Sequence, residues 1–264
     1  MEQIKALREK TGAGIVDCKK ALDEAGGDLD KAVEILRKKG IAKAGKRTDR
    51  EASEGLVLVA VNADHTEGYI LEVNSETDFV SRNDKFQDFS KVTLELIKTN
   101  KPADLDALLA LSINGLSVKD TLDSLSGTIG EKLGIKNFAI LTGATVSGYS
   151  HLGGRIGVLV SLSEAGKSEL ATDIAMQVAA ANPKYLAPEE VPADEIAKEK
   201  EIYREQLLKE GKPEQMIEKI AEGKINKYYS EVCLLKQEFI KDDKKTVEGI
   251  LGGTKIEKFI RYSL

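Results

Sequence analysis

The sequence contains no tryptophan, few other aromatic residues, two histidines and two cysteines. The hydrophobic cores must therefore consist mainly of Val, Ile, Leu and Ala, and an aromatic residue in a polar neighbourhood requires a reason. The histidines, His65 and His151, stand in different predicted loops without a nearby cysteine, so no metal site and no catalytic dyad is expected. Cys18 and Cys233 lie far apart, which indicates two small buried side chains rather than a disulfide.

The chain also lacks an excess of positive charge, since 39 Lys and Arg face 44 Asp and Glu. Nucleic-acid binding requires clustered cations that replace counterions along the phosphate backbone, so no direct contact with nucleic acid is expected. The longest apolar stretches, near 56–61 and 156–162, have the length of strands, and the first residues lack a secretory signal pattern. A cytoplasmic protein with no membrane partner and no cofactor is predicted.

Residues 1–45 are predicted to form a small three-helix domain, because apolar residues recur there at helical spacing. Glycine-containing breaks at 11–14 and 26–28 separate the helices, and Gly40 is expected to end the third. The size of this unit and its glycine-bearing first loop resemble a ubiquitin-associated domain. A charged segment without an apolar stripe follows, and residues 46–53 of it are predicted to be a linker.

The remainder is predicted to be an α+β fold of two related subdomains with antiparallel strands. The first subdomain is placed at 54–140, and the second at 141–187 and 228–264. A projecting antiparallel helical hairpin is predicted between the two parts of the second subdomain, at 188–227, because its helices are highly charged and carry thin apolar stripes.

Individual elements of the two subdomains follow from hydrophobic periodicity and from glycine and proline positions. Strands are expected at 55–61 and 68–73, and a helix at 84–98. A helix at 117–133 is expected to stop at Gly134, and the segment 138–146 is expected to pair with 155–160. The other expected elements are helices at 167–182, 193–210, 213–226 and 246–251 and a strand at 255–263.

Residues 164–168 follow a predicted strand and open a predicted helix, as a phosphate-binding loop would. That motif needs a glycine five residues before Gly166, and Ser161 stands there instead. An NTPase therefore remains an alternative that saturable nucleotide binding by the isolated chain would reveal.

Thr77, Asp78, Phe79 and Val80 place a large aromatic residue beside a carboxylate, in the connection between a strand and a helix. Phe79 either folds back against the face of the following helix or anchors an interface with a partner. Composition alone favours the first alternative.

Several segments together resemble the elongation factor Ts family. They are residues 8–14 (REKTGAG), 17–22 (DCKKAL), 72–80 (EVNSETDFV) and 155–160 (RIGVLV). The resemblance implies a guanine-nucleotide exchange factor that binds the GTPase elongation factor Tu and performs no covalent catalysis. It also implies the predicted fold. An adaptor whose N-terminal helices bind ubiquitin-like or other partners remains the second hypothesis.

The resemblance assigns the exchange activity to residues 77–80, with Asp78 and Phe79 entering the GTPase and disturbing the loops that hold Mg²⁺ and GDP. GTP would then release the factor. Longer relatives add a helical module after the position of Leu264, so that contact is expected to be absent or replaced here.

Further partner contacts are implied at Arg8, Ile15 and Val16 in the N-terminal domain, with ordinary core packing as the alternative for Ile15 and Val16. His151 falls where the family has a histidine followed by glycine and arginine. One more residue separates it from Arg155 in this sequence than in the usual form of the family.

Overall fold

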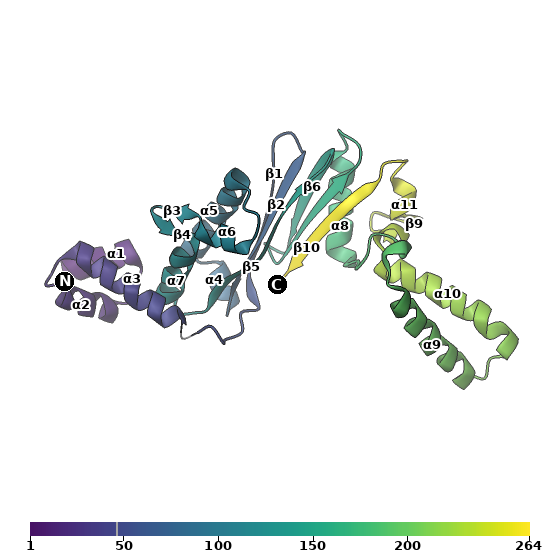
Figure 1. The fold of residues 1–264 in the computed structure, drawn as a ribbon, viewed down its shortest axis with the longest axis horizontal. Helices are drawn as coiled ribbons and strands as arrows, with labels where there is room; N and C mark the ends of the chain where they lie inside the picture. Colours follow the sequence, from purple (N-terminus) through teal and green to yellow (C-terminus); the bar gives the residue numbers. More distant parts are fainter. Residues whose placement is uncertain (46) are drawn as a thin grey trace.

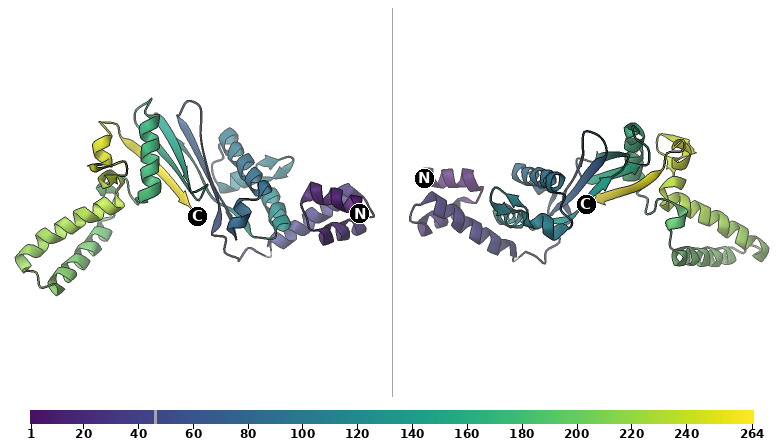
Figure 2. Two further views of the ribbon diagram at one scale, coloured as in Figure 1. Left: turned by 180° about the vertical axis from the view of Figure 1, so that it is seen from behind. Right: turned by 45° about the horizontal axis from the view of Figure 1, so that its top comes forward.

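The computed structural model describes residues 1–45 and 47–264, and Lys46 of the predicted linker lies outside the described residues. The molecule is elongated, with the N-terminal helices at one end, two sheets in the middle and a helical hairpin at the other end (Figures 1 and 2). The C-terminus lies next to the sheets. No helix among the described residues is long and apolar enough to cross a membrane.

The N-terminal unit consists of α1 (Glu2–Thr11), α2 (Ile15–Glu24) and α3 (Leu29–Gly45), which confirms three helices. Gly12 ends α1 in the left-handed conformation, where its N–H donates to the carbonyl of Arg8. A small core joins the helices and comprises Leu7, Ala13, Cys18, Ala21, Leu22 and Ala32. The likeness of this unit to a ubiquitin-associated domain stays a prediction.

The expected end of the third helix at Gly40 is wrong, because α3 continues to Gly45. Gly40 is buried where α3 packs against α7 (Val118–Ile129), and it faces Gly127 of that helix. A Cβ atom on Gly127 would lie 2.7 Å from the carbonyl carbon and oxygen of Gly40. The two glycines therefore allow the helix backbones to touch, and this packing outweighs the poor helix propensity of glycine.

Replacing Gly127 by alanine is expected to push α3 away from α7 and to destabilise the fold by about 1–3 kcal/mol. The new methyl group meets the backbone of Gly40, which cannot rotate away as a flexible side chain would. Thermal unfolding and amide hydrogen exchange in α3 would measure the effect. Gly223→Ala in α10 (Glu214–Val232) is the matched control, because a Cβ there meets nothing within 4 Å. Equal stability of the two variants would contradict the prediction.

The first sheet is antiparallel in the order β1 (Glu54–Val61), β2 (Glu67–Ser75) and β5 (Leu133–Thr142). The second has the order β10 (Ile256–Ser263), β7 (Ile156–Leu162) and β6 (Thr145–His151). Alternate residues of each strand point to opposite faces, so each sheet buries two different surfaces.

One face of each sheet packs against the other sheet, through Val57 and Ile70 of the first and Leu159 of the second. The opposite face of the first sheet packs against α7 and α5 (Asp84–Asn100), with Phe86 fully buried between them. The opposite face of the second sheet is covered by α8 (Ser168–Ala181) through residues such as Ile174. The expected α+β class is confirmed, and so are the strands expected at 55–61, 68–73 and 155–160 and the helices expected at 84–98 and 167–182.

Two details of the predicted core were wrong. The helix α7 ends at Gly130 in the left-handed conformation, and Gly134 lies within β5. The segment 138–146 does not form one strand that pairs with 155–160. Its first part belongs to β5 and pairs with β2, whereas its last part belongs to β6 and pairs with β7. The chain changes sheet at Gly143, where a Cβ would collide with Ser161 of β7.

The predicted hairpin is formed by α9 (Ala193–Lys209) and α10, which project away from the sheets (Figure 1). Its thin core includes Leu207, Ile217 and Ala221. The predicted division of the chain into domains stays a prediction.

Several short elements were not anticipated from the sequence. They are α6 (Leu105–Ala110), β3 (Ser112–Ile113), β4 (Leu116–Ser117), β8 (Glu238–Phe239), β9 (Asp242–Thr246) and the 3-10 helices at Pro188–Glu190 and Leu234–Lys236. The helix expected at 246–251 is present as the single turn α11 (Val247–Ile250).

Candidate functional site

The segment 77–80 forms the start of α4 (Asp78–Ser81), a one-turn helix that follows β2. Val80 is 5% exposed and belongs to the core of the first sheet, whereas Phe79 is 78% exposed. The interpretation that Phe79 folds back on the following helix is therefore wrong. The turn is attached through Val80 and presents Phe79 to the solvent.

Asp78 lies beside Phe79 with about half of its side chain exposed. Its carboxylate is 3.8 Å from the guanidinium of Arg82, four residues later on the helix, which is a loose ion pair. The pKa of Arg155 is raised mainly by its hydrogen bond to Glu54, and the negative charge of Asp78 adds a smaller increase. The carboxylate of Asp78 is thus partly balanced but accessible.

The sequence did not reveal the residues that hold the segment 77–80 in place. Glu131, in the turn between α7 and β5, accepts hydrogen bonds from the backbone N–H of Thr77 at 2.9 Å and from its hydroxyl at 2.7 Å. Glu76 accepts from the N–H of Lys132 at 2.5 Å, and this bond lowers the pKa of Glu76, with Arg50 adding to the effect. In each of these hydrogen bonds, the two residues are more than 50 positions apart in the sequence, so no local pattern predicts the contact.

Ile15 and Val16 begin α2 and are 55% and 66% exposed. The small core of the N-terminal unit uses Cys18 and Ala21 on the other side of this helix. Core packing as the explanation of Ile15 and Val16 is therefore wrong, and α2 presents two adjacent apolar side chains to the solvent. Arg8 on α1 is exposed too.

His151 ends β6, where its Nδ1 lies 2.9 Å from the hydroxyl of Tyr149. The turn that follows exposes Leu152 and returns the chain to Arg155, whose guanidinium bonds to both carboxylate oxygens of Glu54 at 2.6 and 3.1 Å. Glu54 is paired in register with Ser75, two residues before Thr77. The ion pair thus places the turn after His151 at the same end of the sheets as α4.

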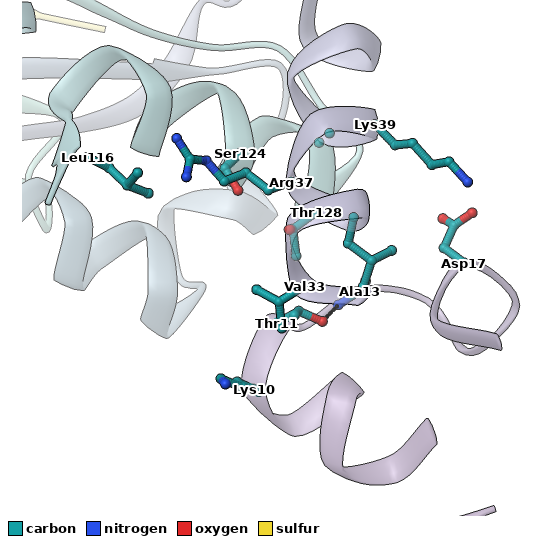
Figure 3. A pocket seen from close by; sticks show the side chains of 13 residues that line it. Lys10, Thr11, Ala13, Asp17, Val33, Arg37, Lys39, Leu116, Ser124 and Thr128 are labelled. Atoms are coloured by element: carbon teal, nitrogen blue, oxygen red, sulfur yellow. Dashed lines mark hydrogen bonds between the residues drawn. The ribbon is translucent and has the colours of Figure 1, made fainter. Parts of the chain in front are cut away.

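A cavity of about 240 Å³ lies between the N-terminal unit and α7, beside the crossing of α3 and α7 (Figure 3). Its charged side chains have partners: Lys10 pairs with Asp30 at 3.0 Å, and Lys39 with Glu24 at 2.5 Å. Arg37 lies 4.0 Å from Asp120. Among the described residues that line the cavity, no two groups are arranged for nucleophilic or acid–base catalysis.

In the alternative phosphate-binding loop at 164–168, Lys167 is bonded to other residues of the chain. The ammonium of Lys167 lies 3.5 Å from the carboxylate of Glu164, and its backbone N–H donates to the hydroxyl of Thr145 at 3.2 Å. Ser161, where the motif needs glycine, is buried within β7. Within the described residues, no cluster of His, Cys, Asp and Glu is arranged to hold a metal ion. Cys18 and Cys233 are buried free thiols, as predicted.

Comparisons with known proteins point to one family. Residues 76–264 match the family described as Elongation factor TS. Over 280 aligned positions, the chain is 44% identical to Elongation factor Ts of Prosthecochloris aestuarii (strain DSM 271 / SK 413), and the alignment covers 100% of this chain and 97% of that protein. The family match begins one residue before Thr77 and includes the hairpin and the second sheet, while the relative also covers the N-terminal helices.

Proposed function

The chain belongs to the elongation factor Ts family, and we propose that it opens the nucleotide site of its partner by inserting Asp78 and Phe79. The family is that of translation elongation factors that exchange guanine nucleotide on elongation factor Tu, without covalent chemistry of their own. The contrast between Phe79, 78% exposed, and the buried Val80 carries the proposal. Aromatic side chains that become buried at an interface contribute much of its binding free energy.

The mechanism is a thermodynamic coupling between two ligands of the GTPase. The factor and GDP each bind elongation factor Tu, and each weakens the binding of the other to the same extent. A tenfold loss of GDP affinity requires about 1.4 kcal/mol of factor binding that is realised only when the nucleotide site is open. Burial of a Phe side chain such as Phe79 supplies free energy of this size.

Asp78 supplies the polar part of the insertion. Its carboxylate is accessible, and in the complex it approaches the loops of the partner that hold Mg²⁺ and the diphosphate of GDP. A carboxylate repels a nearby diphosphate and offers oxygen atoms of the kind that Mg²⁺ prefers, so its approach disfavours the bound nucleotide. GTP binding then releases the factor, and the cycle supports translation elongation in the cytoplasm.

A second surface, which lies away from residues 77–80, also binds the partner. Ile15 and Val16 offer an apolar surface on α2, with Arg8 on the neighbouring helix as a charged contact. His151 is assigned a contact near α4, because its turn lies at the same end of the sheets. The N-terminal contact supplies affinity, whereas residues 77–80 change the nucleotide site.

Purified chain is expected to accelerate the release of labelled GDP from elongation factor Tu at least tenfold, and excess GDP is expected to displace the chain from the complex. Faster release and displacement by GDP are both expected because the factor and GDP each weaken the binding of the other to elongation factor Tu. Release is measured by stopped-flow fluorescence, and displacement by a pull-down with and without GDP. An adaptor would bind through its N-terminal helices without sensitivity to GDP, so binding that GDP leaves unchanged would refute exchange.

A further inference from the structure

The contacts of Thr77 differ from those of an ordinary helix cap. Thr77 is the residue before α4, and its hydroxyl makes no capping bond to the helix. A threonine at this position commonly accepts a hydrogen bond from the first turn. Here the hydroxyl and the backbone N–H both donate to the carboxylate of Glu131, at 2.7 and 2.9 Å, so each carboxylate oxygen receives one bond.

The position of Glu131 is itself fixed by α7. Gly130 ends that helix with a φ of 92°, and its N–H donates to the carbonyl of Ser126 at 2.9 Å. The hydroxyl of Ser126 donates to the backbone carbonyl of Glu131 at 2.5 Å. The next residue, Lys132, donates its N–H to Glu76, beside Thr77. One short turn therefore holds two consecutive residues of the chain that leads into α4.

A helix as short as α4 cannot fix its own direction, because forming a single helical turn is unfavourable without tertiary contacts. Its anchors include the buried Val80 and the two bonds from Thr77 to Glu131. The Ser75 hydroxyl also donates to the Thr77 carbonyl at 2.9 Å, and the Gln87 side-chain amide donates to the Ser81 carbonyl at 3.0 Å. Hydrogen bonds to a carboxylate are stronger than those between neutral groups, and two bonds to one carboxylate also define an orientation. The bonds of Thr77 to Glu131 and the buried Val80 lie on either side of the exposed Phe79 along the chain.

We propose that Glu131 is a positioning residue that sets the direction in which α4 presents Phe79, an inference that rests on the insertion proposed above. Glu131 does not itself need to touch elongation factor Tu in this role. Its effect on exchange passes through the geometry of Thr77 and α4. The same turn is attached to α7, which packs against α3, so α4 and the N-terminal helices share one support.

Glu131→Ala is expected to lower the maximal rate of GDP release about tenfold at saturating concentrations of the chain, while affinity for elongation factor Tu changes less than about threefold. Alanine removes both acceptors. Glu131→Gln is the matched variant, because its amide oxygen accepts from the N–H of Thr77 and its NH₂ group donates to the hydroxyl oxygen. This variant is expected to stay within about threefold of the unchanged chain. Equal rates for both variants and the unchanged chain would overturn the proposal.

A double-mutant cycle tests whether Glu131 acts through Phe79. If it does, adding Glu131→Ala to a Phe79→Ala background changes the release rate no further. A full additional loss in that background would assign Glu131 a separate role and overturn the proposal. Thermal unfolding of each variant confirms that the fold is retained.

A spectroscopic measurement separates this proposal from the proposed function. With fluorinated phenylalanine in the chain, the ¹⁹F resonance of Phe79, assigned by its loss in Phe79→Ala, should shift in Glu131→Ala and stay in place in Glu131→Gln. An unchanged resonance in Glu131→Ala would overturn the positioning role. A shifted resonance with normal GDP release in Phe79→Ala would retain the positioning and refute the insertion.

Discussion

Replacing Phe79 by alanine is expected to lower the maximal rate of GDP release from elongation factor Tu by about tenfold to a hundredfold. Truncation of an aromatic anchor at an interface costs about 2 kcal/mol or more, and each 1.4 kcal/mol corresponds to a factor of ten. The side chain is 78% exposed in the free chain, so the free energy of unfolding should change by no more than about 0.5 kcal/mol. Stopped-flow release of labelled GDP and thermal unfolding measure the two quantities.

Ile240→Ala is the control for this substitution. Ile240 is 49% exposed and lies in the turn between β8 and β9, which is far from α4 (Figure 1). Both substitutions remove an exposed apolar side chain, but only the one at Phe79 should slow exchange. Normal GDP release by Phe79→Ala would eliminate the insertion mechanism.

Reciprocity gives the same substitution a second expected result. If Phe79 contributes to the coupling between the factor and GDP, its loss must weaken two effects equally. These are the effect of the factor on GDP affinity and the effect of GDP on factor affinity. Titration of the Phe79→Ala complex with GDP should therefore displace the chain less readily, relative to its own affinity. A substitution that only damaged the interface would lower affinity and leave the relative effect of GDP unchanged.

The sequence alone left Phe79 between two alternatives for a physical reason. α4 is a single turn, too short for periodicity to indicate which of its side chains is buried. The outcome depends on Val80 entering the core and on Glu131 holding Thr77, a contact that spans 54 positions of the chain. The long amphipathic helices and the first two strands were predictable, because alternation and helical spacing persist there over many residues.

Gly40 and Gly143 illustrate the errors of local interpretation. Glycine commonly ends a helix, but Gly40 is retained inside α3 by its contact with Gly127, which local propensity does not contain. The segment 138–146 is mostly composed of strand-forming residues, and it is divided at Gly143, where the pairing changes from β2 to β7. Gly143 packs there against Ser161. In both places the glycine packs closely against a residue that is far away in the sequence.

Replacing Ile15 and Val16 together by aspartate is expected to weaken binding to elongation factor Tu about thirtyfold or more, without slowing GDP release at saturating concentrations of the chain. Two exposed apolar side chains that become buried at an interface contribute about 1–2 kcal/mol each, and a charge in their place must be desolvated. Isothermal titration against nucleotide-free elongation factor Tu measures the affinity, and a concentration series of the release rate measures the maximal rate.

Ile240→Asp is the control for the added charge, and it is expected to leave both quantities unchanged. The N-terminal substitutions and Phe79→Ala should then differ in kind, the first changing affinity and the second changing the maximal rate. This difference follows from the structure, because Ile15 and Val16 lie on the N-terminal unit whereas Phe79 lies beside the sheets. A fall in the maximal rate at saturation in the N-terminal variant would show that the three-helix unit also takes part in opening the nucleotide site, through its packing on α7.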